Sequence, residues 1–522
     1  MTPQSPTIIV PNCMQSRPMR IHESQGEIGS YVALSHCWGT SQIIKSEKDS
    51  IELRKSSIRW EELSKTFQDA VTITRSLGIP YLWVDSLCII QNDVEDWRAQ
   101  SALMLPIYAK AYITIAADHA IDGSGGCFAS SSRRLARLRH VTLPESFQTS
   151  NNVLVDWDHE YDSDQVHANF CAPELSIDPC SSLSARGWAL QERLVSSRVI
   201  HYTSSELVWE CHDAIDCQCG RLTHSRYKTQ MQTLHEILNL KDQTEELLAL
   251  WIEIVEEYSR RKLTFPTDNL VAINGLANLF QALGIQGYIA GNWKASIEKM
   301  LIWTALGNQL KRRSTEYIAP SWSWASSAQH WKISMPLFGE LTESQVKRRY
   351  LARICSIEAL AAEGNTSGQL HGGRLTVVAR TIKLNLFQAF QIPGMGLWSW
   401  NLVQEETSAV CPVMPDYHHE FESIYMLGQH VTGLLWDVQP DRTRDPEDKK
   451  SWSADKASHI IVLQQIPPSS DERLYRRIGL AYINWSFYLE DSPPPSISGR
   501  TYPWGLAKDW FKDAELGQIT IV

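Results

Sequence analysis

The first 120 residues alternate short apolar runs with segments of helical spacing, which limits the possible folds more than any other feature. Runs at residues 31–35, 81–84 and 112–116 are too short for helices and are typical of buried strands. Between them, residues 60–77 and 92–111 place apolar side chains on one helical face. This alternation predicts an α/β fold, an open parallel sheet with flanking helices.

Glycine and proline punctuate these two expected helices. Gly78 stands where a left-handed C-cap ends the first, and Pro80 prevents its continuation. Pro106 falls inside the second, where it removes a backbone donor. We therefore expect a kink there or a shifted helix start.

The rest of the chain changes character twice. At 522 residues it is too long for one ordinary core, so two or three domains are expected. We predict an N-terminal domain at 1–220 with an irregular insertion at about 123–182. A helical region at 227–335 and a β-rich C-terminal domain at 345–522, with period-two alternation, follow it.

Polar residues follow each strand of the expected parallel sheet. Ser35 and His36 end the first strand, Asp85 follows the second, and Asp118 follows the third. Ligands bind at the carboxyl ends of parallel strands, so His36, Asp85 and Asp118 are expected to face one crevice. There a histidine that titrates near neutrality serves acid–base catalysis or nucleotide binding. The alternative is structural: Asp85 caps a turn and His36 satisfies a buried loop.

A second polar group lies at residues 186–193. Arg186, Gln191 and Glu192 are interleaved with Trp188 and other apolar residues. Burial of Glu192 against apolar surface would raise its pKa and suit it to proton transfer near neutral pH. The alternative is an Arg186–Glu192 ion pair that only fixes the helix.

The cysteines point to packing and not to chemistry. Eleven are scattered through the chain, as in a reduced, cytoplasmic protein. Cys37 and Cys88 are expected to be buried packing thiols, since neighbouring residues on a strand point to opposite faces. We predict no metal site, because one short cluster lacks the spacing of paired zinc ligands: Cys211, His212, Cys217 and Cys219.

Charge and hydropathy exclude several partners. The net charge of −10 argues against nucleic acid, and a basic run at 133–140 is interpreted as a solvated loop. No stretch is apolar and long enough to span a bilayer, and the N-terminus lacks the features of a signal peptide.

Three blocks carry a family resemblance. They read YVALSHCWG at 31–39, YLWVDSLCIIQ within 81–111, and RGWALQER at 186–193. Together they resemble the blocks of the fungal heterokaryon-incompatibility (HET) domain, a family associated with programmed cell death after non-self contact. The catalytic candidates in these blocks are Glu192, Asp85 and His36. Further site residues are expected in or beside the blocks: Ser35, Trp38, Gly39, Trp83, Gln91, Glu95, Asp118, Arg186, Trp188 and Gln191.

The resemblance also implies a fold and a reaction. The HET domain has been likened to TIR-type domains, which have a flavodoxin-like α/β fold and in some lineages cleave NAD with a catalytic glutamate. The resemblance implies NAD as a substrate and identifies no cofactor with certainty. It also implies that Glu192 or Glu95 is the carboxylate that stabilises the ribosyl cation. The sequence departs from the common pattern at His36, Ile90 and Pro106. Because His36 and Ile90 fall in the expected crevice, the resemblance allows a reduced or altered activity.

Three functions remain open at this level. The first is a cell-death effector of non-self recognition, acting by NAD hydrolysis. The second is a non-catalytic module that self-associates or binds a signalling partner. The third is an enzyme of fungal secondary metabolism with a tryptophan-lined pocket, compatible with the twenty tryptophans. The partner, a non-self or signalling protein, and a homo-oligomeric state are expectations only.

Overall fold

The chain forms two compact units in a computed structural model. Unit 1 comprises residues 1–250, 261–264 and 271–283, and unit 2 comprises 251–260, 265–270 and 284–522. The structure describes residues 7–9, 18–25, 27–39, 43–128, 182–204, 206–218, 229–238, 244–306, 313–327, 332–335, 349–361, 369–392, 397–404, 410–438, 458–467, 473–483, 510–511, 513–514 and 516–522.

Unit 1 is built on a mixed sheet whose strands are β1 (Thr7–Ile9), β2 (Arg20–His22), β3 (Tyr31–Ser35), β4 (Tyr81–Trp83), β5 (Ile113–Ala116), β6 (Arg198–Tyr202), β7 (Leu207–Cys211) and β8 (Ile215–Cys217). Their spatial order is β2-β1-β4-β3-β5-β6-β7-β8. The central pairs β4–β3, β3–β5 and β5–β6 are parallel. The predicted parallel sheet is therefore confirmed at its centre.

The two edges of this sheet differ from the prediction of an all-parallel sheet. β1 pairs antiparallel with β2 and β4, and β7 pairs antiparallel with β6 and β8. The connection from Tyr202 to Leu207 is short, and a short connection joins only antiparallel neighbours. The sheet is thus a parallel centre with hairpin-like edges.

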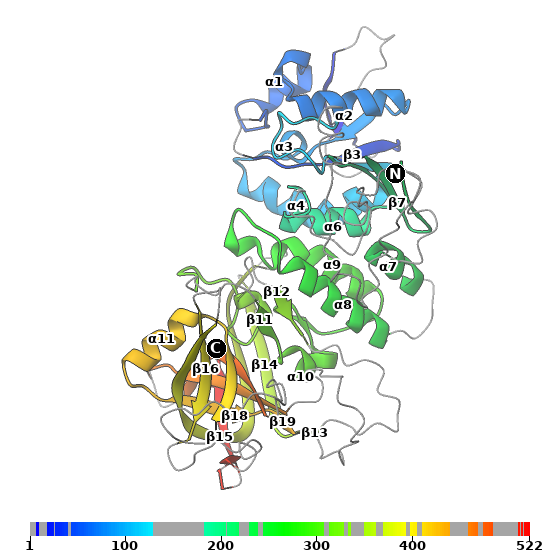
Figure 1. Ribbon diagram of the computed structural model, residues 1–522. Helices are drawn as coiled ribbons and strands as arrows, with labels where there is room; N and C mark the ends of the chain where they lie inside the picture. Colours follow the sequence, from blue (N-terminus) through cyan, green and yellow to red (C-terminus); the bar gives the residue numbers. More distant parts are fainter. Residues whose placement is uncertain are drawn as a thin grey trace, which may run out of the picture. The chain divides into compact units, whose positions relative to one another are not determined.

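Helices cover both faces of this sheet (Figure 1). They are α1 (Ile51–Ser56), α2 (Lys65–Ser76), α3 (Asp85–Cys88), α4 (Val94–Lys110), α6 (Gly187–Val195), α7 (Gln230–Leu238) and α9 (Val271–Ala282). In Figure 1, α2 lies on one face, while α4 and α6 lie on the other with α9 beyond them. This places the first turn of α6 beside the ends of the parallel strands.

Local signals fix where the first two long helices begin and end. The helix predicted at 60–77 starts with a 3₁₀ turn, Trp60–Glu62, and becomes α-helical at Lys65 because the Ser64 side chain accepts a hydrogen bond from the Phe67 amide. Gly78 ends it with φ of +70°, as expected.

The second long helix passes through its proline. Asp93 caps α4 by accepting from the amides of Glu95 and Asp96, so the helix start is not shifted. Pro106 lies in the last turns of the same helix, which continues to Lys110.

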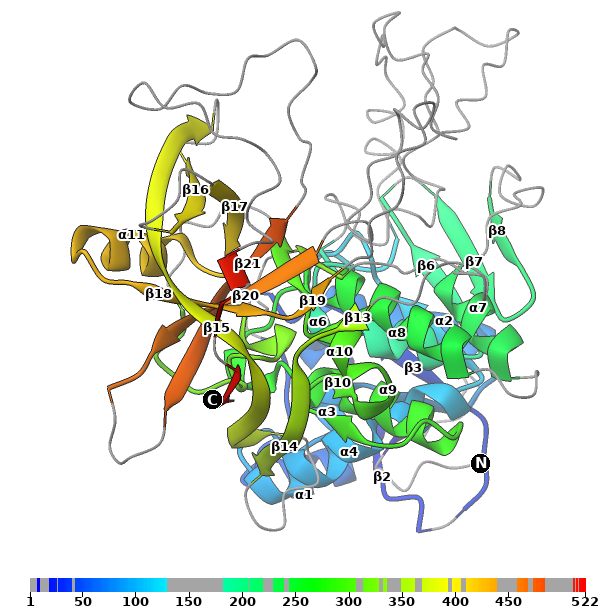
Figure 2. The same ribbon diagram turned by 90° about the horizontal axis from the view of Figure 1, so that it is seen from below.

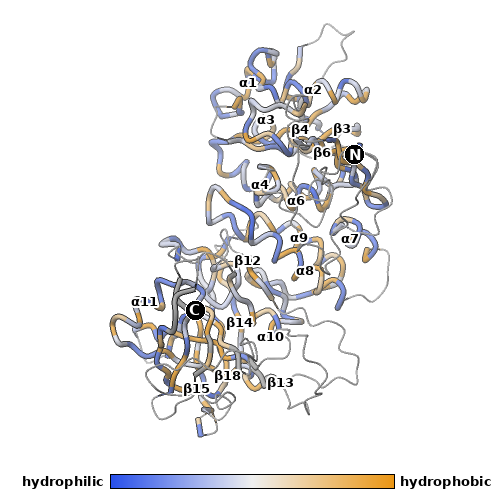
Figure 3. The backbone as a smooth tube through the Cα atoms, in the orientation of Figure 1, coloured by the Kyte–Doolittle hydropathy of each residue, from blue (hydrophilic) through white to orange (hydrophobic). Residues whose placement is uncertain are grey.

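The core of unit 1 follows the buried strands. All five residues of β3 are buried, and Val32, Ala33 and Leu34 have no exposed surface. Figure 3 shows hydrophobic colour along the central strands and hydrophilic colour along α1. A strand buried on both faces reads as a continuous apolar run, which is why these strands were recognisable in the sequence.

Unit 2 has two short helices outside its sheets, α10 (Ile297–Met300) and α11 (His418–Met426), and takes the last half of α8 (Thr244–Tyr258). Its strands are β9 (Tyr288–Ile289), β10 (Asn292–Trp293), β11 (Thr304–Leu306), β12 (Lys332–Ser334), β13 (Arg349–Tyr350), β14 (Arg353–Ala361), β15 (Leu370–Ile392), β16 (Leu397–Val403), β17 (Val410–Pro415), β18 (Val431–Leu435), β19 (Asp437–Val438), β20 (Ser458–Gln465), β21 (Leu474–Ile483) and β22 (Leu516–Ile521). The predicted β-rich C-terminal region is confirmed.

The main sheet of unit 2 closes on itself around β15. Its order is β14-β15-β16-β17-β21-β20-β18, and β18 pairs back to β15. β15 is 23 residues long and strongly curved, with β16 near one end and β14 near the other (Figure 2). Because one strand serves both ends of the ring, the sheet encloses an apolar core that includes Leu375, Val377 and Leu480.

Several sequence predictions lie outside the described residues or stay untested. Of the insertion predicted at about 123–182, residues 129–181 lie outside them, and so does the basic run at 133–140. The region predicted as helical contains α7, α8 and α9 but also β9 to β12. The domain bounds at 220–227 and 335–345 remain predictions, while the compact units divide the chain between 250 and 284.

Candidate functional site

The ends of the parallel strands gather a cluster of polar side chains in unit 1. The Ser35 hydroxyl, at the end of β3, donates to a carboxylate oxygen of Glu192 on α6. Trp38 Nε1 donates to Asp85 Oδ2 over 2.8 Å, and His36 Nε2 lies 3.7 Å from Asp85 Oδ1. The structure therefore brings Ser35, His36 and Asp85 of the strand ends together with Glu192, which the sequence had placed in a separate group.

Glu192 is the most perturbed carboxyl group of this cluster. Only 2% of the residue is exposed. Burial raises its pKa to about 7, against the lowering effects of the Arg186 charge and of hydrogen bonds from Ser35 and Tyr108. A carboxyl group with this pKa gives up and takes back a proton near neutral pH, which is the property predicted from its apolar surroundings.

His36 is buried more completely than the sequence suggested. It is 1% exposed and packs edge-on against Phe67, with ring centroids 5.0 Å apart. Burial lowers its pKa to about 4 although Asp85 raises it. The expectation that His36 titrates near neutrality is therefore wrong: the imidazole is neutral there, and neither of its ring nitrogens has a hydrogen-bond partner among the described residues.

Arg186 holds the cluster through the backbone. Its guanidinium donates to the carbonyl oxygen of His36. No Arg186–Glu192 contact within ion-pair distance is found among the described residues, although the Arg186 charge lowers the pKa of Glu192. The Gly187 amide donates to the Lys262 carbonyl over 2.8 Å, which ties the start of α6 to a later segment of unit 1.

Asp118 belongs to a neighbouring network that the sequence did not reveal. Its carboxylate accepts from His201 Nδ1 over 2.8 Å, and His201 Nε2 lies 3.2 Å from Glu210 Oε2. Arg193, one residue beyond Glu192, pairs with Glu210 through two hydrogen bonds of 2.7 and 3.0 Å. Asp118 thus faces His201 on β6 and not His36. The sequence signal for these partners is weak: the strand-like runs at β6 and β7 place His201 and Glu210 on the sheet, but they do not show which residues they face.

This network makes the charge of His201 part of the fold. Burial would lower the pKa of His201, but Asp118 and Glu210 raise it to about 9. Burial likewise opposes ionisation of Glu210, yet Arg193 and His201 hold the pKa of Glu210 far below its ordinary value. Both groups are therefore charged at neutral pH.

We expect unit 1 to lose stability at alkaline pH through His201. Its folded-state pKa of about 9 exceeds the ordinary 6.5, so its contribution is complete below pH 6.5 and is lost as the pH rises through 9. Urea unfolding should show this as a loss of roughly 1–3 kcal/mol that His201→Gln removes. His119→Gln, which affects only a hydrogen bond to the Tyr202 carbonyl, is the control. An alkaline loss that is the same in both variants would contradict the assignment.

Gln191 faces helix α9 and not the cluster. A Cβ at Gly275 would lie 2.4 Å from Gln191 Oε1, so the glycine permits this close approach of α6 and α9. Gln191 is 2% exposed. Its expected role in the site is therefore indirect: it seats α6, which carries Glu192.

We expect Gly275→Val to disturb the site from outside. The new side chain must displace Gln191, which costs roughly 1–3 kcal/mol of unfolding free energy. Asn278→Val puts the same side chain on the exposed face of α9 and should change stability by less than about 0.5 kcal/mol. Urea unfolding of both variants checks this, and equal midpoints would show that α6 and α9 adjust freely.

The remaining predicted residues build the surroundings. Trp83 is fully buried and packs edge-on against Tyr108, at 5.5 Å between centroids. Gln91 Nε2 donates to the Asp85 and Ile89 carbonyls over 3.1 and 3.0 Å and so shapes the turn after α3. Trp188 is half-buried on α6.

Two further predicted residues lie at the surface. Gly39 has φ of +63°, and a Cβ there would lie 2.2 Å from Asp122 Cβ, so only glycine fits. The Glu95 side chain is 82% exposed and pairs with Arg98 over 2.8 Å. Glu95 has no desolvated surroundings, and Glu192 is the better candidate for the catalytic carboxylate.

Cys37 and Cys88 are buried, as predicted for packing thiols, and the short Cys-His cluster is only partly described. Burial raises the pKa of Cys37 to about 11 and of Cys88 to about 12, so both remain protonated at neutral pH. His212 stacks on His235 with centroids 4.0 Å apart, and Cys219 lies outside the described residues. In the part of the chain that the structure describes, no three His, Cys, Asp or Glu side chains are placed to hold a metal ion.

The fold and this cluster define a class: an α/β domain with a titratable, buried carboxyl group at the carboxyl ends of its parallel strands. Residues 31–192 match the family model described as "Heterokaryon incompatibility protein (HET)". The chain is therefore a protein that contains a heterokaryon-incompatibility domain, as its three sequence blocks predicted. No curated protein and no solved structure matches it. Within the described residues, no helix is both long and apolar enough to cross a bilayer.

Proposed function

We propose that unit 1 is the effector domain of a non-self response and that it acts by hydrolysing NAD to ADP-ribose and nicotinamide. The observation that carries the proposal is Glu192, a buried carboxyl group whose pKa is raised to about 7 and whose oxygen is held by Ser35 at the end of β3. The protein that triggers the response, and any self-association, belong to the same proposal.

The topology supports a nucleotide site at this point. In chain order the parallel strands are β3, β4, β5 and β6, and in space they run β4-β3-β5-β6. This order matches the 2-1-3-4 beginning that the proposal expects of a flavodoxin-like sheet, in which the strand order reverses between the first and third strands. Ser35 and Asp118 follow those two strands, and nucleotides bind at such a reversal.

The proposed reaction breaks the bond between ribose C1′ and the nicotinamide nitrogen. Nicotinamide leaves with the bonding electron pair, and positive charge develops on the ribose. The Glu192 carboxylate stabilises that cation, as oxygen anions do in glycosidic cleavage. A water molecule then attacks C1′, and its proton passes to Glu192 and on to solvent. Neutral His36, whose ring nitrogens have no partner among the described residues, and the carboxylate of Asp85, which Trp38 orients, would bind hydroxyl or amide groups once the cluster is uncovered.

A non-catalytic signalling module is the second candidate, and one observation favours it. Glu192, His36 and Ser35 are 2%, 1% and 4% exposed, so the cluster is covered in this state. A covered cluster of this kind also serves purely to fix the strand ends of a binding domain.

Nicotinamide release from NAD by the full chain separates these two candidates. Turnover above the rate of a heat-treated sample supports hydrolysis, and chromatography should identify ADP-ribose and nicotinamide in equal amounts. Absence of turnover at high protein concentration, with a folded chain by circular dichroism, would leave the signalling module. The full chain is required because unit 1 includes residues as far as 283.

A further inference from the structure

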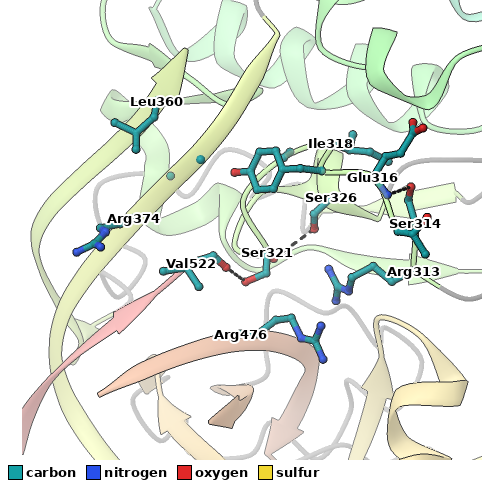
Figure 4. Close-up of a pocket in the computed structure, with 15 residues that line it drawn as sticks. Arg313, Ser314, Glu316, Ile318, Ser321, Ser326, Leu360, Arg374, Arg476 and Val522 are labelled. Carbon is teal, nitrogen blue, oxygen red and sulfur yellow. Dashed lines mark hydrogen bonds between the residues drawn. The ribbon is translucent and has the colours of Figure 1, made fainter. Parts of the chain in front are cut away.

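Unit 2 contains a pocket that no part of the proposed NAD chemistry uses. Its volume is about 440 Å³, which is within the range of sites for small organic molecules. It is lined by a loop at 313–319, by the β14–β15 wall with Leu360 and Gly372, and by Ser321, Arg476 and Val522. Figure 4 shows Arg313 and Arg476 together at one end, with Leu360 on the far wall.

The two ends of this pocket differ in chemistry. Arg313 and Arg476 both approach Glu420: Arg313 Nε lies 2.8 Å and Arg476 Nη2 lies 3.7 Å from Glu420 Oε1. Two guanidinium groups against one carboxylate leave one positive side-chain charge in excess there. The carboxylate of Glu316 points away from both arginines (Figure 4). This end therefore favours an oxyanion.

Arg476 also has a donor to spare. Its Nη2 donates to Gln464 Oε1 over 2.7 Å, but its Nε is buried and makes no hydrogen bond to the described residues. A buried donor without an acceptor costs free energy, and an anionic ligand removes that cost. Of the Arg476 side chain as a whole, 38% is exposed.

The rest of the lining is largely apolar. Ile318, Ala319, Leu360 and the side of Val522 supply aliphatic surface, and Gly372 leaves room that a side chain would take up. The hydroxyl of Ser321 is already committed to the Val522 carbonyl. The aliphatic surface thus suits a hydrocarbon or aromatic body, and a third arginine, Arg374, lies on the same wall as Leu360 (Figure 4).

We propose that this pocket binds a small amphipathic anion, with its oxyanion head at Arg476 and Arg313 and its apolar body against Ile318 and Leu360. The site is separate from the Glu192 cluster of unit 1, and it stands whether or not the chain hydrolyses NAD. A phosphate monoester suits the arginine end better than a monocarboxylate, because it offers three oxygens to the guanidinium donors.

Calorimetric titration of the full chain with 1-naphthyl phosphate, and with neutral 1-naphthol, tests this. The phosphate should bind at least about tenfold more tightly than the naphthol. Arg476→Gln should weaken binding of the phosphate about tenfold and that of the naphthol less than about twofold. Leu360→Trp, which fills the pocket without changing charge, should weaken both. Arg353→Gln, at an exposed position of β14, should bind like the parent chain.

Each alternative outcome overturns the proposal. No binding to the parent chain at millimolar ligand removes the site. Parent-like binding of the phosphate by Arg476→Gln removes the head assignment, and parent-like binding by Leu360→Trp places the ligand elsewhere. Circular dichroism spectra of all variants must match that of the parent. Because Leu360 is 45% exposed and Arg476 is half-buried, neither substitution alters the core of unit 2.

Discussion

Glu192→Gln should reduce nicotinamide release by at least about 100-fold while leaving the fold intact. The amide cannot accept a proton or stabilise a positive ribose. It has the shape of the carboxylate, and its oxygen still accepts the hydrogen bond that Ser35 donates. The loss therefore belongs to the chemistry and not to packing.

Stability gives this variant a second and opposite signature. The folded-state pKa of Glu192 is about 7, above its ordinary value of 4.5, so the parent loses stability as the pH rises through this range. A neutral glutamine does not ionise, and unit 1 of the variant should be as stable as the parent at about pH 4, below the ordinary pKa of the carboxyl group, and more stable at about pH 8. A variant that is inactive and also less stable at pH 8 would point to misfolding.

The pH profile of the parent checks the same group. If Glu192 must be ionised to act, kcat/KM should rise with pH and level off above an apparent pKa near 7. Glu95→Gln is the matched control, because the Glu95 side chain is 82% exposed and forms an ion pair with Arg98 at the surface. Its backbone amide, which donates to the Asp93 side chain, is unchanged by the substitution. Turnover by Glu192→Gln at the parent rate would refute the catalytic role and favour the signalling module.

The sequence predicted the part of this site that depends on local pattern and strand direction. Three buried parallel strands were recognisable as short apolar runs, and parallel strands end at one edge of a sheet. Ser35, His36 and Asp85 could therefore be placed together without any contact information. Glu192 was marked by its apolar neighbours in the block at 186–193.

Contacts between distant segments could not be predicted in the same way. Asp118 meets His201 across 83 positions of sequence, and nothing in the residues around Asp118 distinguishes that partner from His36. His36 follows β3, and its ring packs against Phe67 of α2. The residues next to His36 in the sequence do not show this burial, so they do not predict that the pKa of His36 is lowered. The sequence predicts Gln191 as a site residue, but in the structure its side chain packs against Gly275 of α9.

Unit 2 shows the same limit for strand pairing. Period-two alternation indicates a strand but not its neighbours, because each apolar face fits several partners. The closure of the sheet rests on β15, which pairs with β14, β16, β18 and β22 along its 23 residues. The pocket between the β14–β15 wall and Arg476 depends on how these strands pair, so no sequence motif predicts it.

Arg477→Met should be the most damaging single change in unit 2. Arg477 is 1% exposed, donates to the Leu301 carbonyl over 2.6 Å and to the Trp303 carbonyl, and stacks 3.7 Å from the Trp303 ring centroid. Its Nε lies 3.3 Å from Asp416 Oδ2, and Asp416 is buried as well. Burial raises the pKa of Asp416, and the charge of Arg477 opposes that rise.

Removal of the guanidinium leaves a buried carboxyl group and two carbonyl oxygens without their donor. The expected cost is about 3–5 kcal/mol, because breaking one side of a buried pair strands the other side. Hydrogen exchange measured by mass spectrometry localises the effect: protection of β17 and β21, which flank the pair, should fall by roughly 10²–10³. The amides of β3 to β5 in unit 1 should keep their protection.

Two comparisons decide whether the pair, and not the volume of the side chain, carries this stability. Arg476→Met removes the neighbouring arginine, which is half-buried, and should cost less than about 1 kcal/mol. Adding Asp416→Leu to Arg477→Met removes the stranded carboxyl group and should restore part of the lost protection, since paired apolar replacements of buried ions are tolerated. If the double variant is less protected than Arg477→Met alone, the energy lies in the carbonyl contacts and the stacking on Trp303, and not in the ion pair.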